Sequence, residues 1–120
     1  MAARNLTVAA VQMASGDWDL DRNADRAERL IRAAAARGAG LVLCPELFLT
    51  PYFCVDQNPA HFDLALPADE HPGLARLGAL AAELGVVLPV GFFERAGNAF
   101  FNSIAVFDAD GRRLGVFRKT

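Results

Sequence analysis

Glu46 has the residue type and position to act as a general base. It follows Pro45 directly after an apolar run that is typical of a buried strand. In open α/β sheets, ligands bind beyond the carboxyl ends of the strands, so a carboxylate placed there faces a potential site. The apolar residues 47–49 that follow could raise the pKa of this carboxyl by desolvation, which suits a base working near neutral pH. From spacing alone, a structural role remains open, in which Glu46 caps a turn or pairs with an arginine.

Lys119 and the two cysteines carry weaker signals. Lys119 is the only lysine beside eleven arginines, and it ends a strand-like run, where a lysine is normally a solvated charge. Cys44 lies in an apolar strand and is expected to be a small core residue, as free cysteines often are. Cys54 lies in a loop with no neighbouring cation to lower its pKa. Neither cysteine is therefore expected to be a catalytic thiolate.

Metal and nucleotide sites are poorly supported. His61 and His71 stand ten residues apart in a loop without zinc-site spacing, and both are expected to be ordinary surface residues. The first predicted strand runs into Met-Ala-Ser-Gly-Asp, which lacks the glycine patterns of dinucleotide-binding and P-loop proteins. The sequence thus predicts no metal and no organic cofactor.

The elements that would position these residues form an α/β pattern. Apolar runs at residues 6–13 and 41–44 predict buried strands, since parallel strands covered on both faces are apolar throughout. Between them, residues 20–37 repeat apolar side chains at helical spacing, with Asp19 as the expected N-cap and Gly38 as the stop. Strand, helix and strand in this order predict a βαβ unit.

The second half predicts a long loop followed by a helix and three strands. Residues 46–72 hold four prolines among aromatic residues, and an irregular segment of this length is usually functional. A helix is expected over residues 73–84 and a buried strand over residues 86–90. Residues 101–107 and 113–119 are expected to be antiparallel strands, joined by the Asp108–Gly111 turn.

Composition limits the class of protein. The chain has 120 residues, 53% of them hydrophobic and 22% charged, which suffices for one globular domain. A formal net charge of −2 argues against a partner that is nucleic acid or a membrane surface. No apolar run approaches the ~18 residues of a membrane span, and no secretory signal is evident. We therefore expect a cytoplasmic protein with reduced thiols.

Several motifs, in order and spacing, resemble the nitrilase or carbon–nitrogen hydrolase superfamily. The matching segments are Val8-Ala-Ala-Val-Gln-Met13, Leu41-Val-Leu-Cys-Pro-Glu-Leu-Phe48, Phe101-Asn-Ser-Ile104, Asp108-Ala-Asp-Gly111 and Phe117-Arg-Lys-Thr120. The resemblance implies an αββα sandwich and a Cys-Glu-Lys triad, with Glu46 as general base and Lys119 stabilising the oxyanion. Phe117 stands where many members have tyrosine. Residues 1–120 are expected to be the N-terminal part of a single domain, with the nucleophilic cysteine in a later segment and the chain alone inactive.

The loop from Pro45 to Gln57 resembles that of N-carbamoylputrescine amidases most closely, and β-ureidopropionases and other N-carbamoyl hydrolases are the nearest competitors. A small-molecule N-carbamoyl amine or amide is the expected substrate. Tyr52, Phe53 and Asp56 could offer aromatic faces and an acid to a cationic amine tail, although packing and solvation explain the same residues. The resemblance also implies a homo-oligomer built from dimers. The remaining alternative is a non-catalytic half-domain that uses its open sheet face for assembly.

Overall fold

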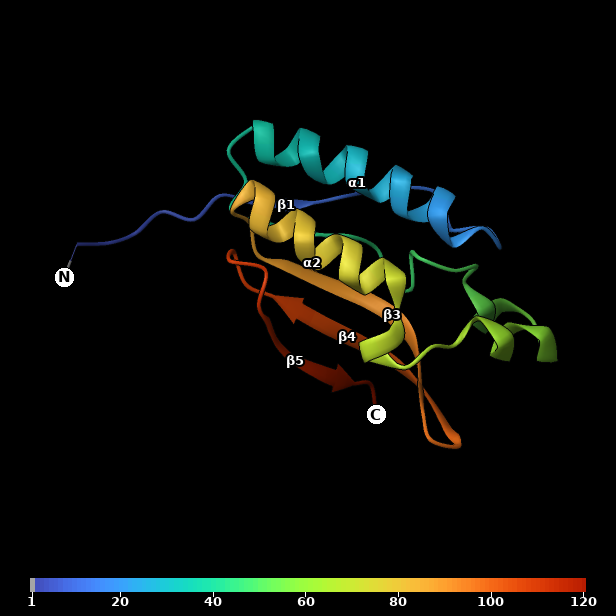
Figure 1. Ribbon diagram of the computed structural model, residues 1–120. Coiled ribbons are helices and arrows are strands. Elements are labelled where there is room, and N and C mark those ends of the chain that lie inside the picture. Colours follow the sequence, from blue (N-terminus) through green and yellow to red (C-terminus); the bar gives the residue numbers. More distant parts are fainter. Residues whose placement is uncertain (1) are drawn as a thin grey trace.

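Two helices lie side by side over one face of a layer of strands (Figure 1). The computed structural model describes residues 2–120. Its elements, in chain order, are β1 (Val8–Ala10), α1 (Leu20–Ala36), β2 (Leu41–Leu43), three short 3-10 turns (Phe53–Val55, Pro59–Leu64 and Ala68–Glu70), α2 (Pro72–Leu84), β3 (Leu88–Ala96), β4 (Ala99–Phe107) and β5 (Arg113–Arg118).

The strands join into one mixed layer. β1 and β2 are parallel, which confirms the predicted strand–helix–strand unit. β3, β4 and β5 form an antiparallel meander. Backbone hydrogen bonds link the two groups, because Val42 N–H donates to the carbonyl of Val87 over 3.1 Å and Val87 N–H donates to that of Gly40 over 2.9 Å. The layer therefore runs from β1 through β2 and β3 to β5.

The helix boundaries follow from their caps. Asp19 caps α1, and its side chain accepts a hydrogen bond from the Arg22 N–H at 3.1 Å, as the sequence predicts. Gly85 ends α2 in the left-handed conformation with φ 65°, which glycine adopts without steric cost. The predicted helices over residues 20–37 and 73–84 are confirmed to within one residue.

His71 is the N-cap of α2, so the prediction that it is an ordinary surface residue is wrong. Its Nδ1 accepts hydrogen bonds from the N–H groups of Gly73 and Leu74, at 3.1 and 3.4 Å. The side chain is buried with its ring edge against Phe92. Burial lowers the pKa of His71 to about 4, so the neutral ring is the capping form.

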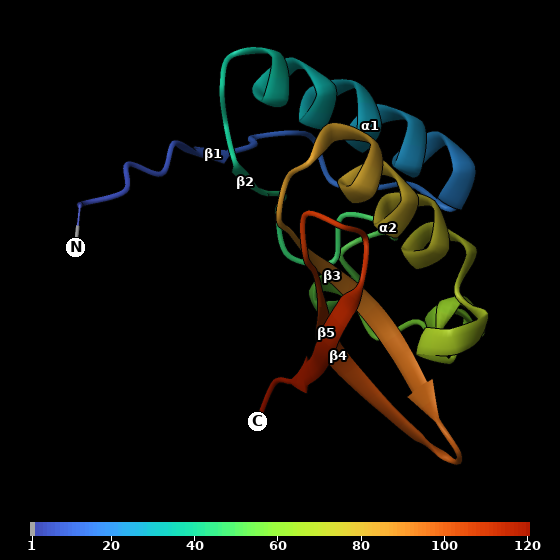
Figure 2. The ribbon, with the colours of Figure 1, turned by 60° about the vertical axis from the view of Figure 1, so that its left-hand side comes forward.

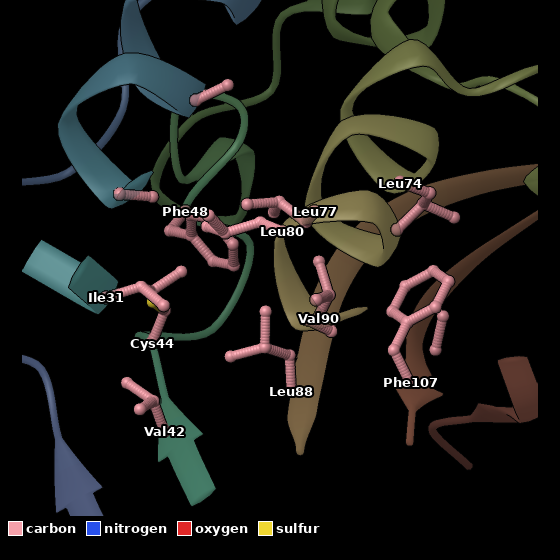
Figure 3. Packing of buried hydrophobic residues seen from close by; sticks show 14 of the residues in the cluster. Ile31, Val42, Cys44, Phe48, Leu74, Leu77, Leu80, Leu88, Val90 and Phe107 are labelled. Carbon is pink, nitrogen blue, oxygen red and sulfur yellow. The ribbon is translucent and has the colours of Figure 1, made fainter. Parts of the chain in front are cut away.

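The core lies between the helices and the strands (Figure 3). Ile31 reaches in from α1 and Leu74, Leu77 and Leu80 from α2. They meet apolar side chains of the strand layer, labelled in Figure 3 as Val42, Leu88, Val90 and Phe107. The apolar stripes of the two predicted helices thus face the side chains that alternate toward one face of the strands.

Two strand predictions need correction. β1 covers only Val8–Ala10 of the predicted run 6–13. β3 continues past residue 90 to Ala96 and turns tightly into β4, forming the long hairpin that projects from the body of the molecule in Figure 2. The charged pair Glu94-Arg95 interrupts the apolar pattern and hides this extension in the sequence.

The strand face opposite the helices has no layer of its own among the described residues. Its exposed apolar side chains include Val8 on β1, Leu43 on β2 and Phe117 on β5, with exposed fractions of 62%, 44% and 64%. One helix layer on one strand layer is half of the αββα sandwich that the family resemblance implies.

Candidate active site

Glu46 stands at a sharp turn directly after β2. The next residue, Leu47, is buried and has a positive φ of 54°, a strained conformation for a leucine. Such strain is often found at functional sites. On β3, Gly91 leaves room for this turn, because a Cβ at Gly91 would lie 3.2 Å from the Leu47 nitrogen. The position of Glu46 therefore depends on a strained backbone at Leu47 and on the close approach of this turn to Gly91.

Lys119, 73 residues further along, reaches the same carboxylate. Its Nζ donates to Glu46 Oε1 over 2.8 Å. Asn102 on β4 donates through Nδ2 to the same oxygen over 2.6 Å, and the Tyr52 hydroxyl donates to Oε2 over 3.3 Å. The structure thus brings together Glu46 and Lys119, as the family resemblance implies. It adds Asn102, which belongs to the Phe101–Ile104 motif but was not predicted to be a site residue.

The pKa of Glu46 is lowered, which corrects the expectation that desolvation raises it. The Lys119 ammonium is the main cause, and the hydrogen bond from Asn102 adds to it. The glutamate in turn raises the pKa of Lys119. With 42% of its side chain exposed, Glu46 is also less buried than its apolar neighbours suggest. The pair is therefore a carboxylate facing an ammonium, and the Asn102 amide orients the carboxylate through its hydrogen bond to Oε1.

The two cysteines do not complete a nucleophilic centre. Cys44 is buried in the core, and burial raises the pKa of its thiol to about 11. Cys54 is exposed in the 3-10 turn Phe53–Val55. The expectation that Cys44 is a core residue is confirmed.

A cleft of about 760 Å³ opens beside Glu46. Tyr52 and Asp56 line it, as does Trp18 from the segment before α1. A second hollow of about 300 Å³ touches the other side of the glutamate and is lined by Asn102, Phe117 and Lys119. Glu46 therefore borders both openings, while Lys119 lines only the smaller one and meets Glu46 there.

The predicted binding residues differ in what they contact. Asp56 lines the cleft, and its Oδ1 is hydrogen-bonded to Nε2 of His61 at 2.7 Å. His61 is buried and stacks on Trp18 with ring centroids 4.8 Å apart, so the expectation that it is an ordinary surface residue is wrong. Phe53 does not line this cleft but stacks on Phe93 at 4.2 Å in a small apolar cluster.

Within residues 2–120, the structure holds no group of three or more His, Cys, Asp or Glu side chains that could bind a metal ion. In the same residues, no helix has the length and hydropathy that crossing a membrane requires. The candidate site is thus built from a carboxylate, an ammonium and hydrogen-bond donors. These groups can move a proton and stabilise negative charge.

The arrangement of these elements and the sequence itself both match a known family of hydrolases. The carbon–nitrogen hydrolase family model matches residues 7–120, and the chain belongs to this family. It is 50% identical over its whole length to the N-carbamoylputrescine amidase of Solanum lycopersicum, and 45% identical over 96% of its length to the citrullinase of Francisella tularensis. The chain spans about 40% of the length of each of these relatives.

Solved structures confirm the nitrilase-type fold. The carbon–nitrogen hydrolase from Helicobacter pylori G27 superposes with a TM-score of 0.85 at 31% identity, over 96% of this chain and 39% of that one. An amidase from Nesterenkonia sp. AN1 superposes with a TM-score of 0.80 at 22% identity, over 97% of this chain and 44% of that one. The described elements therefore form the front part of an αββα sandwich, and the family is one of hydrolases acting on non-peptide C–N bonds.

Proposed function

We propose that the chain is the front part of an amidase that hydrolyses an N-carbamoyl amine, with N-carbamoylputrescine as the substrate. The observation that carries this proposal is the contact of Lys119 Nζ with Glu46 Oε1 at 2.8 Å, at the mouth of a cleft that also presents Asp56. The 50% identity to an N-carbamoylputrescine amidase supports the choice of substrate.

In the proposed reaction, a thiolate attacks the ureido carbonyl carbon and Glu46 takes the thiol proton. The C–N bond to the terminal amide nitrogen breaks, and Glu46 passes the proton to the leaving ammonia. Lys119 stabilises the negative charge that develops on the carbonyl oxygen. Glu46 then activates a water molecule that releases the carbamate, which decomposes to the amine and carbon dioxide.

The nucleophile of this proposal lies outside residues 1–120. Cys44 is buried in the core with a raised thiol pKa, and Cys54 does not match the motif that carries the family's nucleophile. The 120-residue chain alone should therefore be inactive. Supplied with a segment that carries the thiol, the Glu46–Lys119 pair should become catalytic.

Asp56 is the proposed partner of the substrate's cationic tail, together with the Tyr52 ring. Both side chains line the same cleft as Glu46. N-Carbamoylputrescine ends in an ammonium alone, whereas citrulline carries a carboxylate beside its ammonium. The Asp56 carboxylate favours the ammonium of N-carbamoylputrescine and disfavours the carboxylate of citrulline. Hydrolysis of citrulline is the second candidate function, because the chain is 45% identical to a citrullinase.

A chimera tests the proposed substrate. Residues 1–120 would replace the matching segment of the Solanum lycopersicum N-carbamoylputrescine amidase, and ammonia release would be measured with N-carbamoylputrescine, citrulline and N-carbamoyl-β-alanine. We expect N-carbamoylputrescine to have the highest kcat/KM and Asp56→Asn to reduce this preference by about tenfold or more. Equal or better turnover of either carboxylate-bearing substrate would reject the assignment, and unchanged selectivity in Asp56→Asn would reject the role of Asp56.

We further propose that the enzyme is cytoplasmic and takes part in polyamine biosynthesis. It forms a homo-oligomer built from dimers. Its partners are small-molecule substrates rather than nucleic acids or membranes. The net charge of −2 and the amidase relatives support this setting. Sedimentation of the protein isolated from its native source tests the oligomer, since a sharply monomeric species would contradict it.

A further inference from the structure

Lys119 directly follows β5 and is bonded through its backbone to the neighbouring strand β4. Its N–H donates to the Asn102 carbonyl over 2.9 Å, and Arg118 is the final residue in the strand register, opposite Ser103. The direction of the Lys119 side chain depends on how the residue before it is held, and a displacement of about 1 Å of a group that acts on a substrate costs activity. A restraint on Arg118 therefore also fixes where the Lys119 ammonium lies.

The restraint lies on the other face of the same strands. Successive residues of a strand point to opposite faces, so Arg118 points away from the face that carries Lys119. There the guanidinium meets Glu94 of β3 with two hydrogen bonds, Nε to Oε1 at 2.7 Å and Nη2 to Oε2 at 3.0 Å. This bidentate geometry fixes both distance and orientation.

Two neighbours hold this ion pair in place. The Ser103 hydroxyl on β4 donates to Glu94 Oε1 over 2.8 Å. The Arg118 guanidinium also lies over the Phe101 ring, 4.4 Å from its centroid, in cation–π geometry. The Glu94 side chain is only 6% exposed, so losing its partner would leave a buried charge unpaired.

We propose that Glu94 and Arg118 are positioning residues, which clamp the end of β5 on the helix-side face so that Lys119 meets Glu46 on the opposite face. The clamp ties all three strands of the meander together, since Glu94 is on β3, Ser103 on β4 and Arg118 on β5. Neither charged residue touches the cleft beside Glu46. Their effect on catalysis passes through Lys119, and this part of the inference rests on the proposed function.

Lys119 can be observed directly, because it is the only lysine that residues 1–120 contribute to the chimera. In the chimera labelled with isotopic lysine, the side-chain signal that Lys119→Arg removes belongs to Lys119, and its titration by NMR reports the ammonium beside Glu46. We expect Arg118→Met and Glu94→Gln to bring the pKa of Lys119 down toward that of an ordinary lysine. Arg32→Met, which removes a guanidinium paired with Glu28 and Glu83 on the outer helices, serves as the matched control and should leave the signal unchanged.

The same substitutions in the chimera separate positioning from loss of folding. For variants whose melting temperature and dispersed amide spectrum match the parent, we expect kcat to fall by about tenfold or more while KM stays within about twofold. Arg118→Lys should restore less than half of the loss, because a lysine cannot make the bidentate contact.

Two results would overturn the clamp. One is a Lys119 titration that is unchanged in both folded variants, and the other is a kcat equal to that of Arg32→Met. A parent chimera without activity would contradict the proposed function instead, while the shift of the Lys119 signal would still support the clamp.

Discussion

At the scale of single residues, the site is a carboxylate whose partners are each supplied by a different part of the chain. Glu46 comes from the turn after β2, Asn102 from β4, and Lys119 from the end of β5. The lysine and the amide both favour the ionised glutamate, so the resting site holds an ion pair rather than a protonated acid. In the proposed reaction, Glu46 can accept a proton once the developing oxyanion of the substrate draws the Lys119 ammonium away from it.

Asn102 should affect catalysis although it lies outside the predicted set of site residues. In the chimera, Asn102→Ala removes the 2.6 Å hydrogen bond to Glu46 Oε1, so the pKa of Glu46 should rise and its carboxylate should lose its orientation. We expect kcat to fall by about ten- to a hundredfold, with the acid limb of the pH–rate profile moving to higher pH. Asn98→Ala, in the exposed turn between β3 and β4, is the control. Equal rates in the two variants would contradict the role of Asn102.

At the scale of elements, the sequence predicts both helices because their apolar stripes and caps are local signals. The partnership of Glu46 with Lys119 could not be found by spacing, since the two residues are separated by 73 positions and meet only through the strand order. It was predicted through the family resemblance of the motifs around them. A role for Asn102 was not predicted, because its contact with Glu46 depends on the strand register that brings β4 near the turn after β2.

The buried histidines show a second limit of sequence reasoning. A histidine in a proline-rich loop looks solvated in the sequence, but burial depends on what packs over it. His71 packs against Phe92 of β3, and His61 stacks on Trp18, which comes from 43 positions earlier in the chain. The long loop contains no periodic apolar pattern that would reveal either contact.

The N-cap of α2 predicts a pH dependence of stability. Because the folded-state pKa of His71 is lowered to about 4 from 6.5, the unfolded chain binds a proton more readily. This contribution to stability is complete above about pH 6.5 and is lost as the pH falls toward 4. At about pH 4.5 the loss amounts to roughly 2–3 kcal/mol.

Denaturation by urea at about pH 7 and pH 4.5 measures this effect. His71→Asn keeps a capping side chain but does not titrate in this range, so its stability should fall less on acidification than that of the parent, by the same roughly 2–3 kcal/mol. Carboxylates with lowered pKa values, such as Glu28 and Glu94, also lose stability in acid, but they do so in both proteins. Identical pH slopes would show that His71 does not cap α2 as a neutral ring.

At the scale of the whole molecule, the described residues form one helix layer and one strand layer with an apolar outer face. Leu43 and Phe117 lie on that face beside Glu46 and Lys119, lining the hollow of about 300 Å³. The αββα sandwich covers such a face with a second sheet. The candidate active site therefore lies next to the side chains that pack against this second sheet. The family resemblance predicted this architecture, whereas composition indicated only one globular domain and the strand–helix–strand pattern indicated only the α/β class.

The open face should make the 120-residue chain associate with itself. Sedimentation velocity over a range of concentrations should show a mean mass that rises by about twofold or more, and the pair of substitutions Leu43→Thr and Phe117→Thr should suppress this rise. Val55→Thr removes an exposed apolar side chain from the 3-10 turn Phe53–Val55, outside the strands, and should not suppress it. A chain that stays monomeric at all concentrations would contradict the prediction.

We propose Glu46 and Lys119 as the base and the charge-stabilising group of a carbon–nitrogen hydrolase site. The most direct measurement is ammonia release from N-carbamoylputrescine by the chimera with Glu46→Gln, and with Glu28→Gln on the outer helices as control. Glu46→Gln keeps the shape of the side chain but removes the base, so kcat should fall by about a thousandfold or more while Glu28→Gln stays within about twofold of the parent. A Glu46→Gln chimera that keeps more than about a tenth of the parental kcat would contradict the account.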